Sequence, residues 1–179
     1  TQLIGAAFGS SGERCMALSV AVVVGDKTAD ALIVKMKKAM ADLKVGDYTD
    51  NTNDFGPLIT KEHKAKVSSC IDSAEKQGAT IEVDGRNIVV KGCEEGYFIG
   101  GTLIDRVTAD MDSYQEEIFG PVLQVIRVDS MSDAMQLIDD HKYGNGTSIY
   151  TSDGEVSRHF TTNSKIGMVG VNVPIPVPM

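Results

Sequence analysis

Strand-like and helix-like segments alternate along the 179-residue chain, and this alternation constrains its fold more than any other feature. Residues 17–24 and 122–128 are nearly continuous apolar runs, which is typical of strands buried on both faces. Between them, apolar residues repeat at three- and four-residue spacing over 28–43, as in an amphipathic helix. Strands that alternate with helices of this length imply βαβ units, so we expect an α/β fold with a largely parallel sheet flanked by helices.

The remaining segments continue this pattern. Thr60 is a candidate N-cap for a helix that Gly78 would end, and Asp84-Gly85-Arg86 favours a hairpin between 80–83 and 87–90. Further elements are expected as strands over 98–107, 148–151 and 168–173, and as helices over 130–140 and 154–163. Because no repeat or linker interrupts the chain, we expect one domain over residues 1–179.

Composition excludes several classes of protein. Lys plus Arg number 17 against 25 Asp plus Glu, a net charge of −8, and no basic run is longer than two residues, which argues against a nucleic-acid binder. No apolar run reaches membrane-spanning length, and no signal peptide opens the chain. Three cysteines without a CxxC pair, and three separated histidines, indicate free thiols in a reducing compartment such as the cytoplasm, and no metal site.

The two ends of the chain are apolar. The sequence starts at Thr1 just before Leu3-Ile4, and it stops at a proline-rich stretch, 174–179. Natural termini are more often polar and frayed. We therefore expect this chain to be a segment excised from a longer protein.

The first candidate site is the Gly/Ser-rich stretch 9–12 that leads to Arg14-Cys15. Glycine lets a substrate approach the backbone closely, and a helical turn starting at Cys15, together with Arg14, would favour the thiolate, a strong nucleophile for carbonyl carbon. The alternative is a buried structural cysteine beside a solvated arginine. A cysteine peptidase would need a partner histidine that the sequence does not locate.

The second candidate site is Glu116-Glu117-Ile118-Phe119-Gly120-Pro121-Val122, directly before the apolar run 122–128. A carboxylate there can accept hydrogen bonds from sugar hydroxyls, and Phe119 can pack on a flat ring. The alternative is a solvated acidic pair and a core phenylalanine. The stretch 143–147, Tyr-Gly-Asn-Gly-Thr, fails the dinucleotide-binding fingerprint and is interpreted as a turn.

Taken together, the Cys15 loop and the 116–122 segment resemble two motifs of the aldehyde dehydrogenase superfamily, in the family's order. The stretches 12–17, 143–147 and 167–176 resemble its CoA-acylating branch, the methylmalonate- and malonate-semialdehyde dehydrogenases. The resemblance covers essentially the whole chain. It implies the fold of the family's catalytic domain, with the cofactor-binding domain and an oligomerisation tail outside this segment, so we expect the segment alone to be inactive.

The resemblance also implies roles for individual residues. Cys15 would be the nucleophile that forms a thioester, Arg14 would hold the substrate carboxylate, and Glu117 and Phe119 would contact NAD. Methylmalonate semialdehyde would yield propionyl-CoA and CO2, and malonate semialdehyde acetyl-CoA, with CoA as co-substrate, in valine, pyrimidine or inositol catabolism. The full-length protein would be a homo-oligomer, cytoplasmic or, in a eukaryote, in the mitochondrial matrix. The alternatives are a hydrolysing aldehyde dehydrogenase and a non-catalytic α/β interaction domain.

Overall fold

The computed structural model describes residues 2–175, and a four-stranded sheet lies at its centre. Its strands, in spatial order, are β1 (Val20–Val24), β4 (Val122–Val128), β3 (Thr102–Asp105) and β2 (Thr80–Val83). β4 runs parallel to β1 and to β3, whereas β2 pairs with β3 in the antiparallel sense. The predicted α/β fold with a largely parallel sheet is confirmed.

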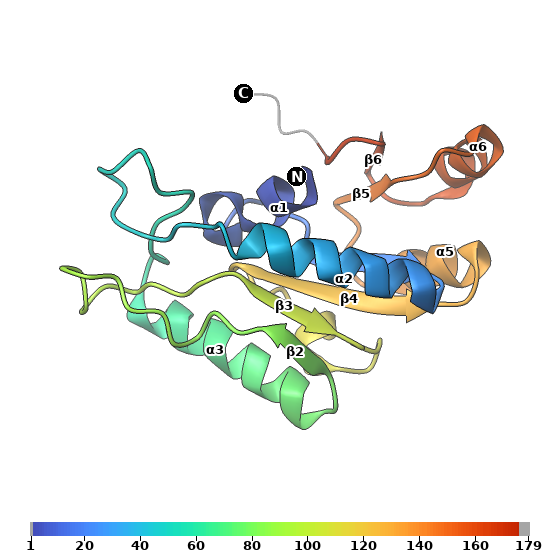
Figure 1. Cartoon of the computed structure of the whole chain (residues 1–179). Coiled ribbons are helices and arrows are strands. Elements are labelled where there is room, and N and C mark those ends of the chain that lie inside the picture. Colours follow the sequence, from blue (N-terminus) through green and yellow to red (C-terminus); the bar gives the residue numbers. More distant parts are fainter. Residues whose placement is uncertain (1, 176–179) are drawn as a thin grey trace.

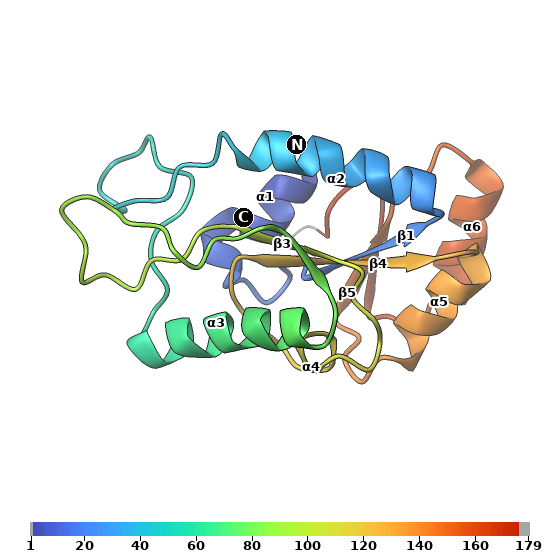
Figure 2. The same cartoon turned by 60° about the horizontal axis from the view of Figure 1, so that its bottom comes forward.

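One long helix covers each face of this sheet (Figure 2). These helices are α2 (Asp26–Met40) and α3 (Lys61–Lys76). Because side chains alternate along a strand, β4 contributes to a core on both faces. Leu123 and Val125 pack with residues of α2, whereas Val122 and Ile126 pack with residues of α3. The apolar run that predicted this strand is therefore explained by burial on two sides.

A second, two-stranded sheet lies to one side of the first (Figure 1). Its parallel strands are β5 (Gly146–Ile149) and β6 (Met168–Val171), joined by α6 (Gly154–Asn163). The other elements are α1 (Gln2–Phe8), the 3-10 helix η1 (Gly9–Gly12), α4 (Asp112–Gln115) and α5 (Met131–Asp140). The family resemblance extended over residues 167–176. Pro176, the last of these, lies outside the described residues.

Most predicted elements are present, with ends that shift by a few residues. β4 occupies the predicted range, and the Thr60 hydroxyl accepts a hydrogen bond from the His63 amide at 3.1 Å, as expected of the N-cap of α3. Ser130 caps α5 in the same way, through the Asp133 amide. Local sequence signals thus define these boundaries well.

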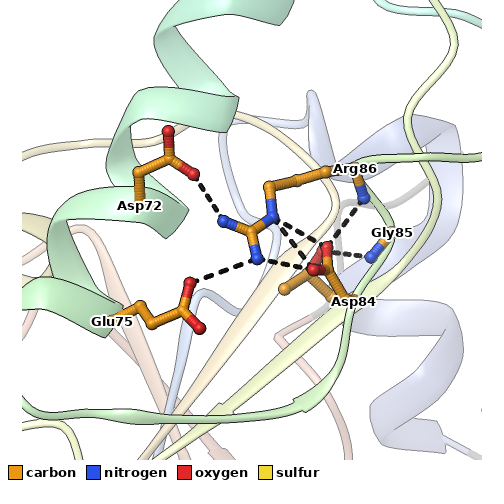
Figure 3. Close-up of polar contacts among 6 residues, drawn as sticks. Asp72, Glu75, Asp84, Gly85 and Arg86 are labelled. Carbon is orange, nitrogen blue, oxygen red and sulfur yellow. Dashed lines mark hydrogen bonds and ion pairs between the residues drawn. The ribbon is translucent and has the colours of Figure 1, made fainter.

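The hairpin predicted across Asp84-Gly85-Arg86 is wrong, since residues 87–90 form no strand and β2 pairs with β3 instead. Arg86 turns onto α3 and donates hydrogen bonds to Asp84, Asp72 and Glu75 (Figure 3). These bonds, those to Asp84 foremost, raise the pKa of the Arg86 guanidinium. A charged network between Arg86 and α3 therefore takes the place of the local hairpin. The identity of the turn residues alone does not predict such long-range contacts.

Candidate active site

The four residues singled out in the sequence line one cleft. It has a volume of about 1320 Å³ and runs between β1 and β5, and its lining includes Arg14, Cys15, Glu117 and Phe119. Cys15 is exposed, not sealed in an apolar core. The fold thus brings together two motifs that lie far apart in the sequence.

The site lies at the amino ends of the strands. Cys15 precedes the first residue of β1, and Glu117 and Phe119 precede the first residue of β4. A ligand in an open α/β sheet is generally expected beyond the carboxyl ends of the strands. These residues therefore lie at the opposite end of the sheet from the one that this rule gives. At the carboxyl ends, Arg127 instead pairs with Asp105 at 2.6 Å.

The loop that carries Cys15 is shaped by three successive residues with positive φ. Ser10, Ser11 and Gly12 have φ values of 52°, 58° and 69°. This conformation costs a non-glycine residue about 1 kcal/mol, and the Ser11 hydroxyl offsets part of it by donating to the Gly56 carbonyl at 2.8 Å. These residues lie within η1, directly after α1, and the bend that they form places the following residues, Arg14 and Cys15, at the cleft.

No helix begins at Cys15, so the condition under which a helix dipole would favour its thiolate is not met. Residues 14–17 form a single turn, closed by a hydrogen bond from the Ala17 amide to the Arg14 carbonyl at 3.0 Å. The helix lies before the site, as α1, because the positive φ values of Ser10 and Ser11 interrupt helical geometry. Stabilisation of a thiolate by a helix dipole at Cys15 therefore has no structural basis here.

The two motifs pack backbone against backbone. A Cβ atom on Gly12 would lie 2.2 Å from the carbonyl oxygen of Gly120. Gly120 in turn packs on α3, since a Cβ atom there would lie 2.7 Å from Cγ2 of Val67. Only glycine permits approaches this close, so these positions set the spacing between Cys15 and the 116–121 segment.

The first turns of α3 hold the backbone of that segment. Nε2 of His63 lies 2.6 Å from the Phe119 carbonyl oxygen and 3.5 Å from a carboxylate oxygen of Glu13, and Nζ of Lys66 donates to the Glu117 carbonyl at 2.8 Å. Burial raises the pKa of the Glu13 carboxyl, and the nearby His63 opposes this shift. His63 is separated from the other histidines in the sequence and was assigned no role there; only the tertiary fold places it between the two motifs.

The structure distinguishes the two adjacent carboxylates. Glu116 forms an ion pair with Lys142 at 2.7 Å. Glu117 is exposed and makes no ion pair with any residue between 2 and 175. Ile118 beside it is buried, and Phe119 keeps 36% of its surface exposed at the cleft. Exposed and buried side chains thus alternate along this segment. Glu117 and Phe119 face outward, and the buried Ile118 between them anchors the segment in the core.

The guanidinium group of Arg14 is also presented at the cleft. Its Nε donates to the Ser10 hydroxyl at 3.0 Å, and the group lies over Gly9, where a Cβ atom would be 3.4 Å from Nη1. Within the described part of the chain, no carboxylate pairs with Arg14. Both terminal nitrogens are therefore available to an incoming anion.

The other two cysteines differ from Cys15 in environment. Cys70 lies on α3, packed against the core, and burial raises the pKa of its thiol. Cys93 is partly buried in the loop after β2. Across residues 2–175, no three His, Cys, Asp or Glu side chains are placed to hold a metal ion. None of the helices in that stretch combines the length and apolar character needed to cross a bilayer.

Comparisons with known proteins agree with this geometry. The model of the aldehyde dehydrogenase family matches residues 1–179. A crystal structure of methylmalonate-semialdehyde dehydrogenase from Oceanimonas doudoroffii is 66% identical, with a TM-score of 0.97 over 99% of this chain and 36% of that one. A Sinorhizobium meliloti protein assigned as the same enzyme, in complex with NAD, is 54% identical, with a TM-score of 0.96 over the same shares of the two chains.

A curated relative extends the comparison beyond bacteria. The Bos taurus mitochondrial methylmalonate-semialdehyde/malonate-semialdehyde dehydrogenase [acylating] is 48% identical over 97% of this chain and 32% of its own. The chain thus spans about a third of the length of the proteins that it matches. The match of the family model over all 179 residues, together with these likenesses, identifies the chain as a member of the aldehyde dehydrogenase family.

Proposed function

We propose that this chain, as the catalytic domain over residues 1–179 of a longer protein, carries out the NAD-dependent, CoA-acylating oxidation of methylmalonate or malonate semialdehyde. The observation that supports this most is the shared cleft: an exposed cysteine lines it together with a guanidinium and a carboxylate that have no ion-pair partner among residues 2–175. An aldehyde that also carries a carboxylate matches these groups in chemistry. The names of the relatives support the same substrate class.

In the proposed reaction, the thiolate of Cys15 attacks the aldehyde carbon and forms a thiohemiacetal. Arg14 holds the substrate carboxylate through its two terminal nitrogens and so orients that carbon toward the sulfur. Loss of hydride from the carbon leaves a thioester on Cys15. The substrate carboxylate leaves as CO2, and the enolate of the thioester that remains takes up one proton at the α-carbon. The thiol of CoA then gives its proton to the solvent and displaces the Cys15 thiolate from the acyl carbon, giving propionyl-CoA or acetyl-CoA.

The cleft offers groups that suit NAD, which supplies the hydride acceptor when bound. The free carboxylate of Glu117 can accept hydrogen bonds from ribose hydroxyls, and the ring of Phe119 can pack on a flat ring. Lys66 and His63 fix the backbone carbonyls of these two residues, which keeps both side chains directed at the cleft. We propose further that the full-length protein is a homo-oligomer, cytoplasmic or, in a eukaryote, in the mitochondrial matrix.

The product formed by the full-length protein tests the proposal. With methylmalonate semialdehyde and NAD, we expect steady NADH formation that depends on CoA, and propionyl-CoA as the product detected by mass spectrometry. Steady turnover without CoA that releases a free acid would favour the hydrolysing alternative. Absence of NADH formation with every aldehyde offered would favour a non-catalytic domain.

Exchanging Glu117 for glutamine should impair use of the cofactor. A hydrogen bond to a charged group contributes about 1.5–3 kcal/mol, so Glu117→Gln in the full-length protein should lower kcat or raise the KM for NAD by about ten- to hundredfold. The KM for the semialdehyde should change much less. Steady-state kinetics with each substrate varied in turn would measure this split.

Glu116→Gln is the matched control, because it makes the same chemical change one residue away. Glu116 already pairs with Lys142 at 2.7 Å, so its replacement should leave both constants within about threefold, as for an exposed ion pair. If Glu117→Gln left both kcat and the KM for NAD unchanged, the cofactor role of Glu117 would be wrong.

A further inference from the structure

We infer that Asn145 is a positioning residue for the nucleophile. Its side-chain amide Nδ2 donates to the backbone carbonyl oxygen of Cys15 at 2.8 Å, from a point 130 residues away in the sequence. Asn145 lies just before β5, and both residues line the cleft. The inference rests on the proposed role of Cys15 and gives a role to a segment that the sequence analysis interpreted as a turn and included in the family resemblance.

The backbone around Asn145 is fixed to the second sheet. The carbonyl of Gly144 accepts from the Gly167 amide at 2.9 Å, and the carbonyl of Asn145 accepts from the Met168 amide at 3.1 Å. The next residue, Gly146, pairs with Met168 in the β5–β6 ladder. The amide that reaches Cys15 therefore projects from an ordered strand end.

A histidine fixes the other side of the same segment. Nδ1 of His141 accepts from the Tyr143 amide at 3.0 Å, so the ring proton must sit on Nε2, which lies 2.9 Å from the Tyr114 carbonyl. Tyr114 belongs to α4, directly before the 116–121 segment. The approach to Asn145 is thus held against the same part of the fold that presents Glu117 and Phe119.

A second contact brings β5 against the nucleophile turn. A Cβ atom on Gly146 would lie 2.6 Å from Cε of Met16, the residue that follows Cys15. The turn itself is closed by one local hydrogen bond, from Ala17 to Arg14. Residues 145 and 146 therefore supply a polar and a steric restraint to an exposed turn that has little internal structure.

This restraint matters for chemistry because attack on a carbonyl needs the reacting atoms about 3–3.5 Å apart, and a misplacement of about 1 Å can cost roughly a hundredfold in rate. If the Cys15 carbonyl were free, its peptide could rotate and carry the sulfur with it. A donor at position 145 prevents that rotation, whereas a carboxylate of the same shape would only repel the carbonyl oxygen.

The test uses the full-length protein with Asn145→Leu and Asn145→Ser, neither of which can form the bond at this distance. We expect kcat with the semialdehyde to fall by about ten- to hundredfold, with the KM for NAD and for the semialdehyde within about threefold. We also expect amide hydrogen exchange in a peptide spanning residues 13–18 to become at least about tenfold faster, since its turn loses an anchor.

Asn163→Leu is the matched control, because the Asn163 amide also donates to a backbone carbonyl, that of His159 at 2.8 Å, but on α6. It should change neither readout. Asn145→Ser is the smaller change and keeps the test valid should Asn145→Leu fail to fold.

Unchanged exchange over residues 13–18 in a folded variant would overturn the inference, as would faster exchange with an unchanged kcat. If the wild-type protein does not oxidise the semialdehyde at all, the proposed function fails. The exchange measurement then decides by itself whether Asn145 restrains the turn.

Discussion

Replacing Cys15 with alanine in the full-length protein is expected to lower aldehyde-dependent NADH formation by about four orders of magnitude or more, because removal of a nucleophile eliminates the covalent route. Cys15 is exposed in the cleft that Arg14 and Glu117 also line. Activity assays over a wide range of enzyme concentration would measure the loss. The folded state should be preserved, since Cys15 contributes little to either core.

The other cysteines provide the controls for this experiment. Cys70→Ala and Cys93→Ala should each keep most of the activity, and in the wild type Cys15 should react with iodoacetamide near neutral pH well before Cys70, the pKa of which burial raises. Substantial NADH formation by Cys15→Ala would contradict the nucleophile role. Labelling of Cys70 or Cys93 ahead of Cys15 would favour the non-catalytic alternative.

Arg14→Ala should separate substrates by whether they carry a carboxylate. In the full-length protein we expect the bound substrate to desolvate the guanidinium–carboxylate pair. Loss of that pair should then lower kcat/KM for methylmalonate semialdehyde by about two to three orders of magnitude. Propanal has no carboxylate to lose and should be affected much less. Arg14→Lys should recover part of the activity, since an ammonium keeps the charge but not the planar fork.

The geometry of Arg14 supports this design. Its Nε is already engaged by the Ser10 hydroxyl at 3.0 Å, which orients the group and leaves the two terminal nitrogens for the substrate. Arg158→Ala, an equal change of charge on the exposed surface of α6, is the matched control. If Arg14 acted instead by favouring the thiolate, both substrates would lose equally and activity would move to higher pH; equal losses would therefore end the carboxylate-anchor role.

The sequence predicted the fold well wherever one segment carried its own signal. The apolar run 122–128 marks β4 because that strand is buried on both faces, and Thr60 and Ser130 mark the starts of α3 and α5 because their hydroxyls satisfy helix amides within three residues. Cys15, Arg14, Glu117 and Phe119 were found through motif resemblance, and the fold places all four on one cleft. Their roles stay predictions until the variants are measured.

What the sequence could not determine depends on contacts between distant segments. The hairpin across Asp84-Gly85-Arg86 gives way to pairing of β2 with β3, because Arg86 gains carboxylate partners on α3 that a turn pattern does not reveal. The bend that separates α1 from Cys15 is equally hidden in the sequence, because Ser10 and Ser11 take positive φ values that neither residue favours by itself.

The residues that hold the site in place also act through contacts between distant segments. His63 and Asn145 lie far from Cys15 in the sequence, and no local pattern assigns either one a role at the site. His63 lies between the two motif loops, and Asn145 donates to the Cys15 carbonyl. The sequence by itself determined most of the order of strands and helices and indicated the candidate reactive groups, since periodicity, capping and motifs are local. Only the tertiary structure decided how those groups are held, because close backbone approaches and long-range hydrogen bonds form when segments distant in sequence pack together.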